Sequence, residues 1–101
     1  MISQPMNGKS LEEIIEERKD IIKMLKKEGY NVMDTIIKNK GNELEDIHYL
    51  LASLEFLINA DYIFFMQGWE KSRGCKIEHL VAVEYGKKIM YENKIENYNN
   101  L

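Results

Sequence analysis

The stretch from Tyr62 to Met66 is an almost continuous apolar run. A run this short, without polar alternation, is typical of a strand that is covered on both faces of a parallel sheet. A polar, glycine-containing loop, Gln67 to Gly74, follows the run and leads into an amphipathic helix. This strand–loop–helix order builds ligand sites in α/β proteins, because the free N–H groups at a helix start attract negative charge.

Strand-like and helical segments alternate along the rest of the chain. The predicted strands are Met1–Ser3, Tyr30–Asp34, Tyr62–Met66 and Lys88–Tyr91. The first helix is predicted to start at the capping box of Ser10 and Glu13 and to stop at Gly29. The second follows an apolar stripe on one helix face, made of Leu44, Ile47, Leu51, Leu54 and Ile58. The third is outlined by Ile77, Leu80 and Val81 and stops before Gly86.

The order β-α-β-α-β-α-β predicts an α/β fold, with a parallel sheet of about four strands and helices on both faces. With strand order 2-1-3-4, the direction in which successive strands are added to the sheet reverses between the first and third strands. Ligands bind beyond the carboxyl ends of the strands at such a point. The loops expected to meet there are Gln4–Gly8 and Gln67–Gly74. The domain is expected to span residues 1–91, and the polar tail 92–101 reads as a loose end or an oligomer contact.

Composition limits the class of protein. A chain of 101 residues, 45% hydrophobic and 31% charged, indicates one globular domain. A net charge of −3 argues against a general nucleic-acid binder. No apolar run approaches the roughly 20 residues that span a bilayer, and no signal-peptide pattern is present. A single cysteine fits a reducing cytosol. These features predict a cytoplasmic, self-associating domain without a membrane partner.

Glu78 is the first candidate for a functional residue, and two readings of it stay open. The spacing alone favours a glutamate in the first turn of the third helix, where it complements the helix dipole. The functional reading is a carboxylate nucleophile that faces an anomeric carbon. Trp69 is likewise either a stacking platform for a base or part of the cleft wall.

Other motifs favour structural readings. Gly8-Lys9-Ser10 looks like the end of a P-loop, but Ser3 stands where that motif needs a glycine, so a capped helix start is the better account. His48 and His79 lack partners at metal-ligand spacing. Cys75 reads as a small residue at a tight turn. We therefore expect neither a metal nor a cofactor.

Several segments together resemble one family: Ile2–Gly8, Ala60–Phe65, Gly68–Trp69 and Ser72–Glu78. It is the small phage and bacterial branch related to nucleoside 2-deoxyribosyltransferases and deoxynucleoside 5'-monophosphate N-glycosidases. The resemblance covers the chain to about Tyr91. It implies a flavodoxin-like parallel sheet and cleavage of the bond between base and deoxyribose by a glutamate that attacks C1'.

Within this resemblance Glu78 matches the nucleophile. Ser72 matches a serine that contacts the 5'-phosphate in the monophosphate glycosidases, where the transferases have an aspartate. With Arg73 and Gly74 beside it, Ser72 favours a phosphorylated ligand. The first loop is expected to lie beneath the sugar and phosphate. The implied ligand-binding set is Ser3, Gln4, Pro5, Met6, Asn7, Gly8, Gly68, Trp69, Ser72, Arg73 and Gly74.

The sequence also departs from this family. Ser53 stands where the family has a second catalytic carboxylate, Met1 where it has a strand tyrosine, and Pro5 where it has a phosphate-contacting serine. Residues that a neighbouring subunit supplies have no clear counterpart in the tail. Two functions follow: an enzyme acting on a nucleoside or nucleotide, or an inactive protein that sequesters a nucleotide-like signal. A purely structural module has the weakest support, and an even-numbered homo-oligomer such as a dimer is expected.

Overall fold

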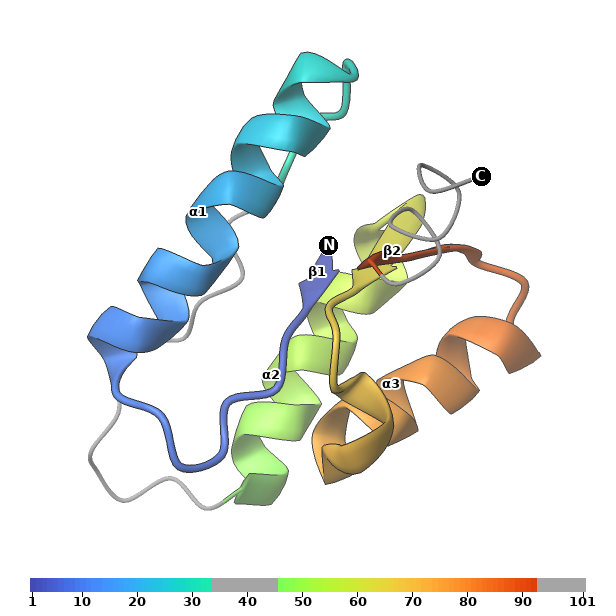
Figure 1. Cartoon of the computed structure of the whole chain (residues 1–101). Coiled ribbons are helices and arrows are strands. Elements are labelled where there is room, and N and C mark those ends of the chain that lie inside the picture. The colour runs from blue at the N-terminus through green and yellow to red at the C-terminus, as the bar shows by residue number, and fades with distance from the viewer. Residues whose placement is uncertain (34–45, 93–101) are drawn as a thin grey trace.

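Three parallel strands form the centre of the protein. They are β1 (Ile2–Ser3), β2 (Tyr62–Phe65) and β3 (Lys88–Tyr91), and they lie in the order β1-β2-β3. Ile2 pairs with Phe64, which in turn pairs with Met90. The structure is a computed structural model that describes residues 1–33 and 46–92 (Figure 1). The α/β class, the parallel direction and these three strands confirm the prediction from the sequence.

The predicted strand at Tyr30–Asp34 is not seen as a strand in the described residues. Residues 30–33 belong to no strand, and Asp34 lies outside the described residues, as does Leu44 of the predicted second helix. The segment nevertheless lies against the sheet. The ring of Tyr30 meets that of Tyr62 edge-on, with centroids 5.1 Å apart, and Val32 packs against the core cluster around β1. A fourth strand beside β1 thus stays a prediction.

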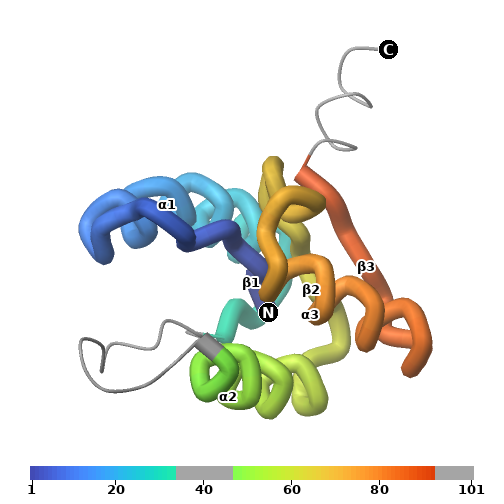
Figure 2. The backbone as a smooth tube through the Cα atoms, turned by 90° about the horizontal axis from the view of Figure 1, so that it is seen from below, coloured from blue at the N-terminus to red at the C-terminus, as the bar shows by residue number. Residues whose placement is uncertain are grey.

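Helices cover both faces of the sheet. On one face lies α1 (Leu11–Lys27), whose buried Ile21 and Leu25 pack against the strands. On the other face lie α2 (Asp46–Asn59) and α3 (Arg73–Glu84), and the sheet runs between them and α1 in Figure 2. Ser10 caps α1, and Glu13 closes the predicted capping box.

The two hydrophobic clusters follow from the alternation of side chains along β2. Phe64 and Met66 point toward α1, where they pack with Ile2. Ile63 and Phe65 point to the opposite face, toward α2 and α3. Because both faces are covered, the nearly unbroken apolar run of the sequence is explained.

The start of α3 corrects one expectation. Ser72 is the N-cap of this helix, and its hydroxyl accepts a hydrogen bond from the N–H of Cys75 at 3.3 Å. The helix therefore begins at Arg73, and its first turn holds no acidic residue. Glu78 lies one turn further on. The expectation of Glu78 in the first turn is wrong, and complementing the helix dipole does not account for it.

The outer side of α2 is unusually apolar. Leu57 of this helix is buried in the core, but Ile47, Leu51 and Ile58 are 67%, 61% and 65% exposed. Three members of the apolar stripe predicted from the sequence thus face solvent. A helix that is apolar on both sides is normally covered on both sides. None of the described helices is long and apolar enough to cross a membrane.

Candidate functional site

Glu78 is a buried carboxylate at the carboxyl end of β1. Its side chain comes from α3, and the residue is only 7% exposed. The hydroxyl of Ser3 donates a hydrogen bond to Oε1 of Glu78 at 2.5 Å, across 75 positions of the chain. Ser3 is itself 1% exposed. The two residues are therefore fixed to each other in the interior, as expected of a site built where strand and helix meet.

A second hydroxyl also reaches this carboxylate. The side chain of Ser53, on α2, hydrogen-bonds to Glu78. Burial raises the pKa of Glu78 above its ordinary value, while the hydrogen bonds from Ser3 and Ser53 lower it in part. The position where the resemblance expects a second carboxylate is thus in direct contact with Glu78. It supplies a neutral hydrogen-bond donor in place of an acid.

Cys75 lies beside this group. It is a free, buried thiol. Burial raises its pKa, hydrogen bonds with Ser3 and Ser72 lower it, and the charge of Glu78 raises it further. A raised pKa keeps the thiol protonated near neutral pH, so a nucleophilic role is not supported.

The two predicted loops do meet at this end of the sheet. The N–H of Met66 bonds to the carbonyl of Ser3 at 3.0 Å, which ties the end of β2 to the start of the first loop. Gly68 follows with φ +91°, and a Cβ added there would lie 3.7 Å from Cγ of Pro5. The prediction that Gln4–Gly8 and the loop after β2 lie side by side is confirmed.

The remaining predicted ligand residues lie at the rim of these loops. Met6, Asn7 and Gly8 are exposed, in a turn that the N–H of Lys9 closes on the carbonyl of Met6 at 3.2 Å. Arg73 is exposed at the start of α3, next to Gly74. The structure therefore brings the predicted residues to one end of the sheet, with only Glu78, Ser3 and Gln4 buried among them.

Trp69 belongs to an aromatic cluster. It lies on the short 3₁₀ helix η1 (Trp69–Lys71), and its indole stacks on the ring of His79 with centroids 4.1 Å apart and planes 23° from parallel. His79 also hydrogen-bonds to the hydroxyl of Tyr91, and Phe65 meets it edge-on. Burial lowers the pKa of His79. One face of the indole is thus covered by a neutral imidazole at pH 7.

A separate polar network lies on the α1 side of the sheet. Gln4 is 5% exposed, and its Nε2 donates to the carbonyl of Ile14 at 2.9 Å and to Oε1 of Glu17 at 3.2 Å. Arg18, which is 2% exposed, donates from Nε to Oε1 of Gln4 at 2.8 Å. Because the side chains of neighbouring residues in an extended segment point to opposite faces, Ser3 contacts Glu78 on the α3 side of the sheet. Gln4 contacts Glu17 and Arg18 on the α1 side.

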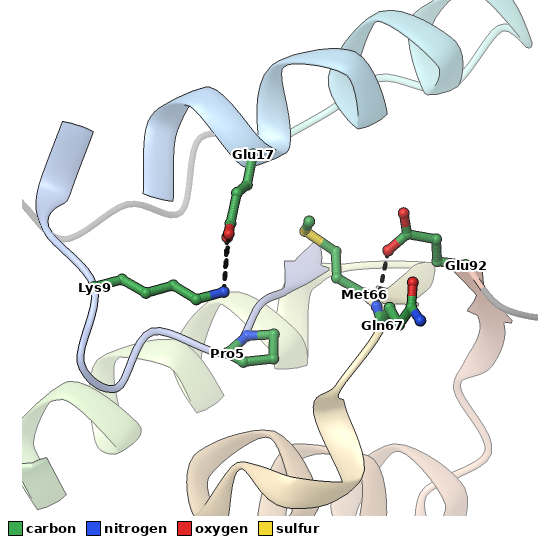
Figure 3. A pocket seen from close by; sticks show the side chains of 6 residues that line it. All are labelled: Pro5, Lys9, Glu17, Met66, Gln67 and Glu92. Atoms are coloured by element: carbon green, nitrogen blue, oxygen red, sulfur yellow. Dashed lines mark hydrogen bonds and ion pairs between the residues drawn. The ribbon is translucent and has the colours of Figure 1, made fainter. Parts of the chain in front are cut away.

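This network opens into a hollow of about 320 Å³. On one side Nζ of Lys9 contacts both carboxylate oxygens of Glu17 at 3.0 Å; on the other, Oε1 of Glu92 accepts from the N–H of Gln67 at 2.8 Å (Figure 3). The full lining is Pro5, Lys9, Glu17, Met66, Gln67 and Glu92. Among the described residues, neither Glu78 nor the start of α3 belongs to it.

The sequence did not point to several of these residues. Arg18 could have been found, because it shares the helical spacing of Ile14, Ile21 and Leu25 and therefore lies on the buried face of α1. Ser53 is different, because the family resemblance already points to its position, whereas its contact with Glu78 depends on how two helices pack. Glu92 falls in the expected polar tail, and no local pattern identifies it.

No metal site is present in residues 1–33 and 46–92, where no group of three or more His, Cys, Asp or Glu side chains could hold an ion.

Fold and site together define a small parallel α/β domain with one buried carboxylate at the carboxyl end of its first strand. Over residues 1–91 the chain matches the family described as Domain of unknown function (DUF4406), and it belongs to that family. No curated protein and no solved structure matches the chain.

Proposed function

We propose that this domain binds a nucleoside 5'-monophosphate and cleaves or transfers its N-glycosidic bond through Glu78. The observation that carries this function is the buried Ser3–Glu78–Ser53 group beside two polar loops. A carboxylate that is desolvated and held by two hydroxyls has a fixed orientation, which a nucleophile needs. Structural stability alone does not call for such a group, since burying a carboxylate costs free energy.

In the proposed reaction, an oxygen of Glu78 forms a bond to C1' of the sugar. The C1'–N bond breaks, its electron pair leaves with the base, and the base takes a proton from water. Water or a second base then attacks C1' and passes a proton to the hydroxide left by the first water, and the C1'–O bond breaks to release Glu78 as a carboxylate. Water provides the first proton because Ser53 is no acid near neutral pH.

The start of α3 is the proposed phosphate site. The helix has 12 residues, and the N–H groups of its first turn are directed toward the loop. Arg73 adds an exposed guanidinium at this end. The hydroxyl of Ser72 accepts from the N–H of Cys75 and can still donate its own proton to a phosphate oxygen, whereas the backbone N–H of Ser72 is bonded to the carbonyl of Trp69.

The proposed architecture is the flavodoxin-like one, with a fourth strand next to β1 in the order 2-1-3-4. The packing of Tyr30 and Val32 against the core around β1 supports it. These numbers count the four predicted strands along the chain. In this order the direction in which successive strands are added to the sheet reverses next to β1, the strand that carries Ser3.

A second function is favoured by one observation. Ser53 contacts Glu78 without supplying a proton, and losing a general acid typically costs about 10²- to 10⁴-fold in rate. A domain of this kind can hold a nucleotide and sequester it unchanged. The two functions differ in the fate of the ligand.

Incubation with deoxynucleosides and their 5'-monophosphates, followed by chromatography, distinguishes the two. The enzyme releases free base, and Glu78→Gln, which keeps the size of the side chain, abolishes release while the protein stays folded. A sequestering protein is stabilised against heat by the same ligands and returns them intact. Base release that survives Glu78→Gln contradicts the proposed mechanism, and absence of both binding and release contradicts both functions.

We further propose that the domain works as a homodimer or a larger even-numbered assembly in the cytoplasm. The exposed stripe of Ile47, Leu51 and Ile58 supports a second copy as the partner, because these positions repeat at the spacing of a helix–helix seam. Leu51→Glu should shift the protein to the monomer in light scattering, while Glu16→Gln, an exposed change on α1 away from this stripe, should not. A monomeric wild-type protein contradicts this assembly.

A further inference from the structure

We propose that the hollow between α1 and the ends of β2 and β3 is the base subsite, and that it selects bases with an exocyclic amino group. This deepens the proposed function and rests on it. Glu17 and Glu92, on opposite sides of the hollow, are the residues that make the selection (Figure 3).

The position of the hollow suits one end of a nucleotide. Pro5 and Gln67 line it, and these residues belong to the two loops that also lead to Glu78 and to α3. Ser3 faces Glu78 on one side of β1, whereas Gln4 faces the hollow's wall on the other. A nucleotide that crosses the carboxyl end of β1 thus has its base on the α1 side and its phosphate on the α3 side.

The charges of the hollow exclude the phosphate from it. One cation, Lys9, and two carboxylates, Glu17 and Glu92, give the lining a net charge of −1. Lys9 is also already engaged by both oxygens of Glu17. A dianionic phosphate is repelled by such a lining, whereas a neutral base is not.

The carboxylates are fixed hydrogen-bond acceptors. The hydrogen bond from Lys9 is the main cause that lowers the pKa of Glu17, and the bond from Gln4 lowers it further. The buried Arg18 donates a hydrogen bond to Gln4, and Gln4 donates one to Glu17. The orientation of Glu17 is therefore supported from the interior. On the far side the N–H of Gln67 holds Glu92. Such support from behind is typical of a site organised before its ligand arrives.

These acceptors define the ligand chemistry. Ionised carboxylates accept hydrogen bonds and cannot donate them. Adenine, cytosine and guanine carry an amino group that donates, while Pro5 and Met66 offer an apolar surface to the ring. Thymine and uracil place a carbonyl oxygen where the amino group stands, so an acceptor would face an acceptor. Two acceptors that face each other repel, so thymine and uracil lose the hydrogen bond that an amino group makes and should bind more weakly.

Calorimetry on the wild-type protein tests this base selection. The ligands are the 5'-monophosphates of deoxyadenosine, deoxycytidine, deoxyguanosine, thymidine and deoxyuridine, and chromatography checks that each stays intact. At least one amino-bearing nucleotide should bind measurably more tightly than the thymidine and deoxyuridine compounds. Glu17→Gln and Glu92→Gln each place an amide donor in the hollow and should reduce that ratio. Glu16→Gln, on the solvent side of α1 where Glu16 pairs with Lys19 at 3.7 Å, should leave it unchanged.

The outcomes separate the two levels of inference. Nucleotides that bind without discrimination between the two groups of bases, or with a ratio that neither variant changes, overturn the base subsite and leave the proposed function standing. If no monophosphate binds the wild-type protein, the proposed function and the base subsite fall together. Thermal unfolding of each variant separates a change in the site from loss of the fold.

Discussion

Ser3 and Glu78 are joined by a hydrogen bond of 2.5 Å between a strand at the start of the chain and a helix near its end. Both residues are buried, and Ser53 adds a second hydroxyl to the same carboxylate. The bond fixes the helix to the sheet at the level where the loops meet. It also opposes the effect of burial on the pKa of Glu78, because hydroxyl donors favour the ionised form; burial is the larger cause, so the pKa is raised.

The stability of the domain should depend on the protonation of Glu78. The folded-state pKa is raised above the ordinary 4.5, so this residue's contribution to stability is full below pH 4.5 and is lost as the pH rises through the folded-state value. Glu78→Gln removes the charge and should raise stability at pH 7 while flattening the pH dependence above 4.5. Urea unfolding between pH 4 and 8 measures this. An unchanged slope in the variant would show that Glu78 is ionised at no cost.

Trp69 should report the charge of His79. It is the single tryptophan of the chain, and it stacks on this histidine. Burial lowers the pKa of His79, so the emission of Trp69 should change with a midpoint below the ordinary 6.5. His79→Gln should abolish the transition. His48→Gln, the change at the other histidine, serves as the control and should preserve it.

Ser53→Asp should increase base release if the domain is an enzyme. The new carboxyl group would lie against Glu78, where a like charge keeps one of the two protonated and able to act as an acid. The expected gain is about 10²- to 10⁴-fold in the rate of base release. Ser53→Asn matches the size of the side chain and should give no gain. Equal rates for both variants would mean that protonation of the base does not limit the reaction.

Gln4→Ala should destabilise the domain. Gln4 accepts from the buried guanidinium of Arg18 and donates to the carbonyl of Ile14, so both groups lose a partner. The expected loss is about 1–3 kcal/mol in the free energy of unfolding, measured with urea. Glu16→Ala, at an exposed position of α1, should change it by less than about 0.5 kcal/mol. A loss for Gln4→Ala no larger than this control would mean that the network contributes little.

Much of the framework could be predicted from the sequence, because its signals are local. The capping box of Ser10 and Glu13 depends on a spacing of three residues, and the apolar run of β2 on continuous burial. The meeting of the two loops followed from the direction of parallel strands. The place of Glu78 after such a loop marks it as a candidate residue. The sequence, however, predicts it in the first turn of the helix, whereas the structure has it one turn further on.

The rest depends on contacts between distant segments. The hydrogen bond of Ser53 to Glu78 requires the packing of α2 beside α3, which helical periodicity does not specify. Glu92 follows the last strand, and only its bond to the N–H of Gln67 ties it to the hollow. The apolar stripe of α2 was visible in the sequence. Which of its members face solvent was not, since apolar residues lie on more than one side of the helix.

The opposite directions of Ser3, the last residue of β1, and Gln4, the first residue after it, have a consequence for how this family can diversify. Ser3 hydrogen-bonds to the buried carboxylate of Glu78, and Gln4 hydrogen-bonds to Glu17 in the wall of the hollow. The backbone separates these two side chains. In the proposed function, substitutions around Lys9 and Glu17 would therefore alter which base is recognised without disturbing the group around Glu78. A short strand of this kind is a partition that would let the proposed specificity and reactivity evolve independently.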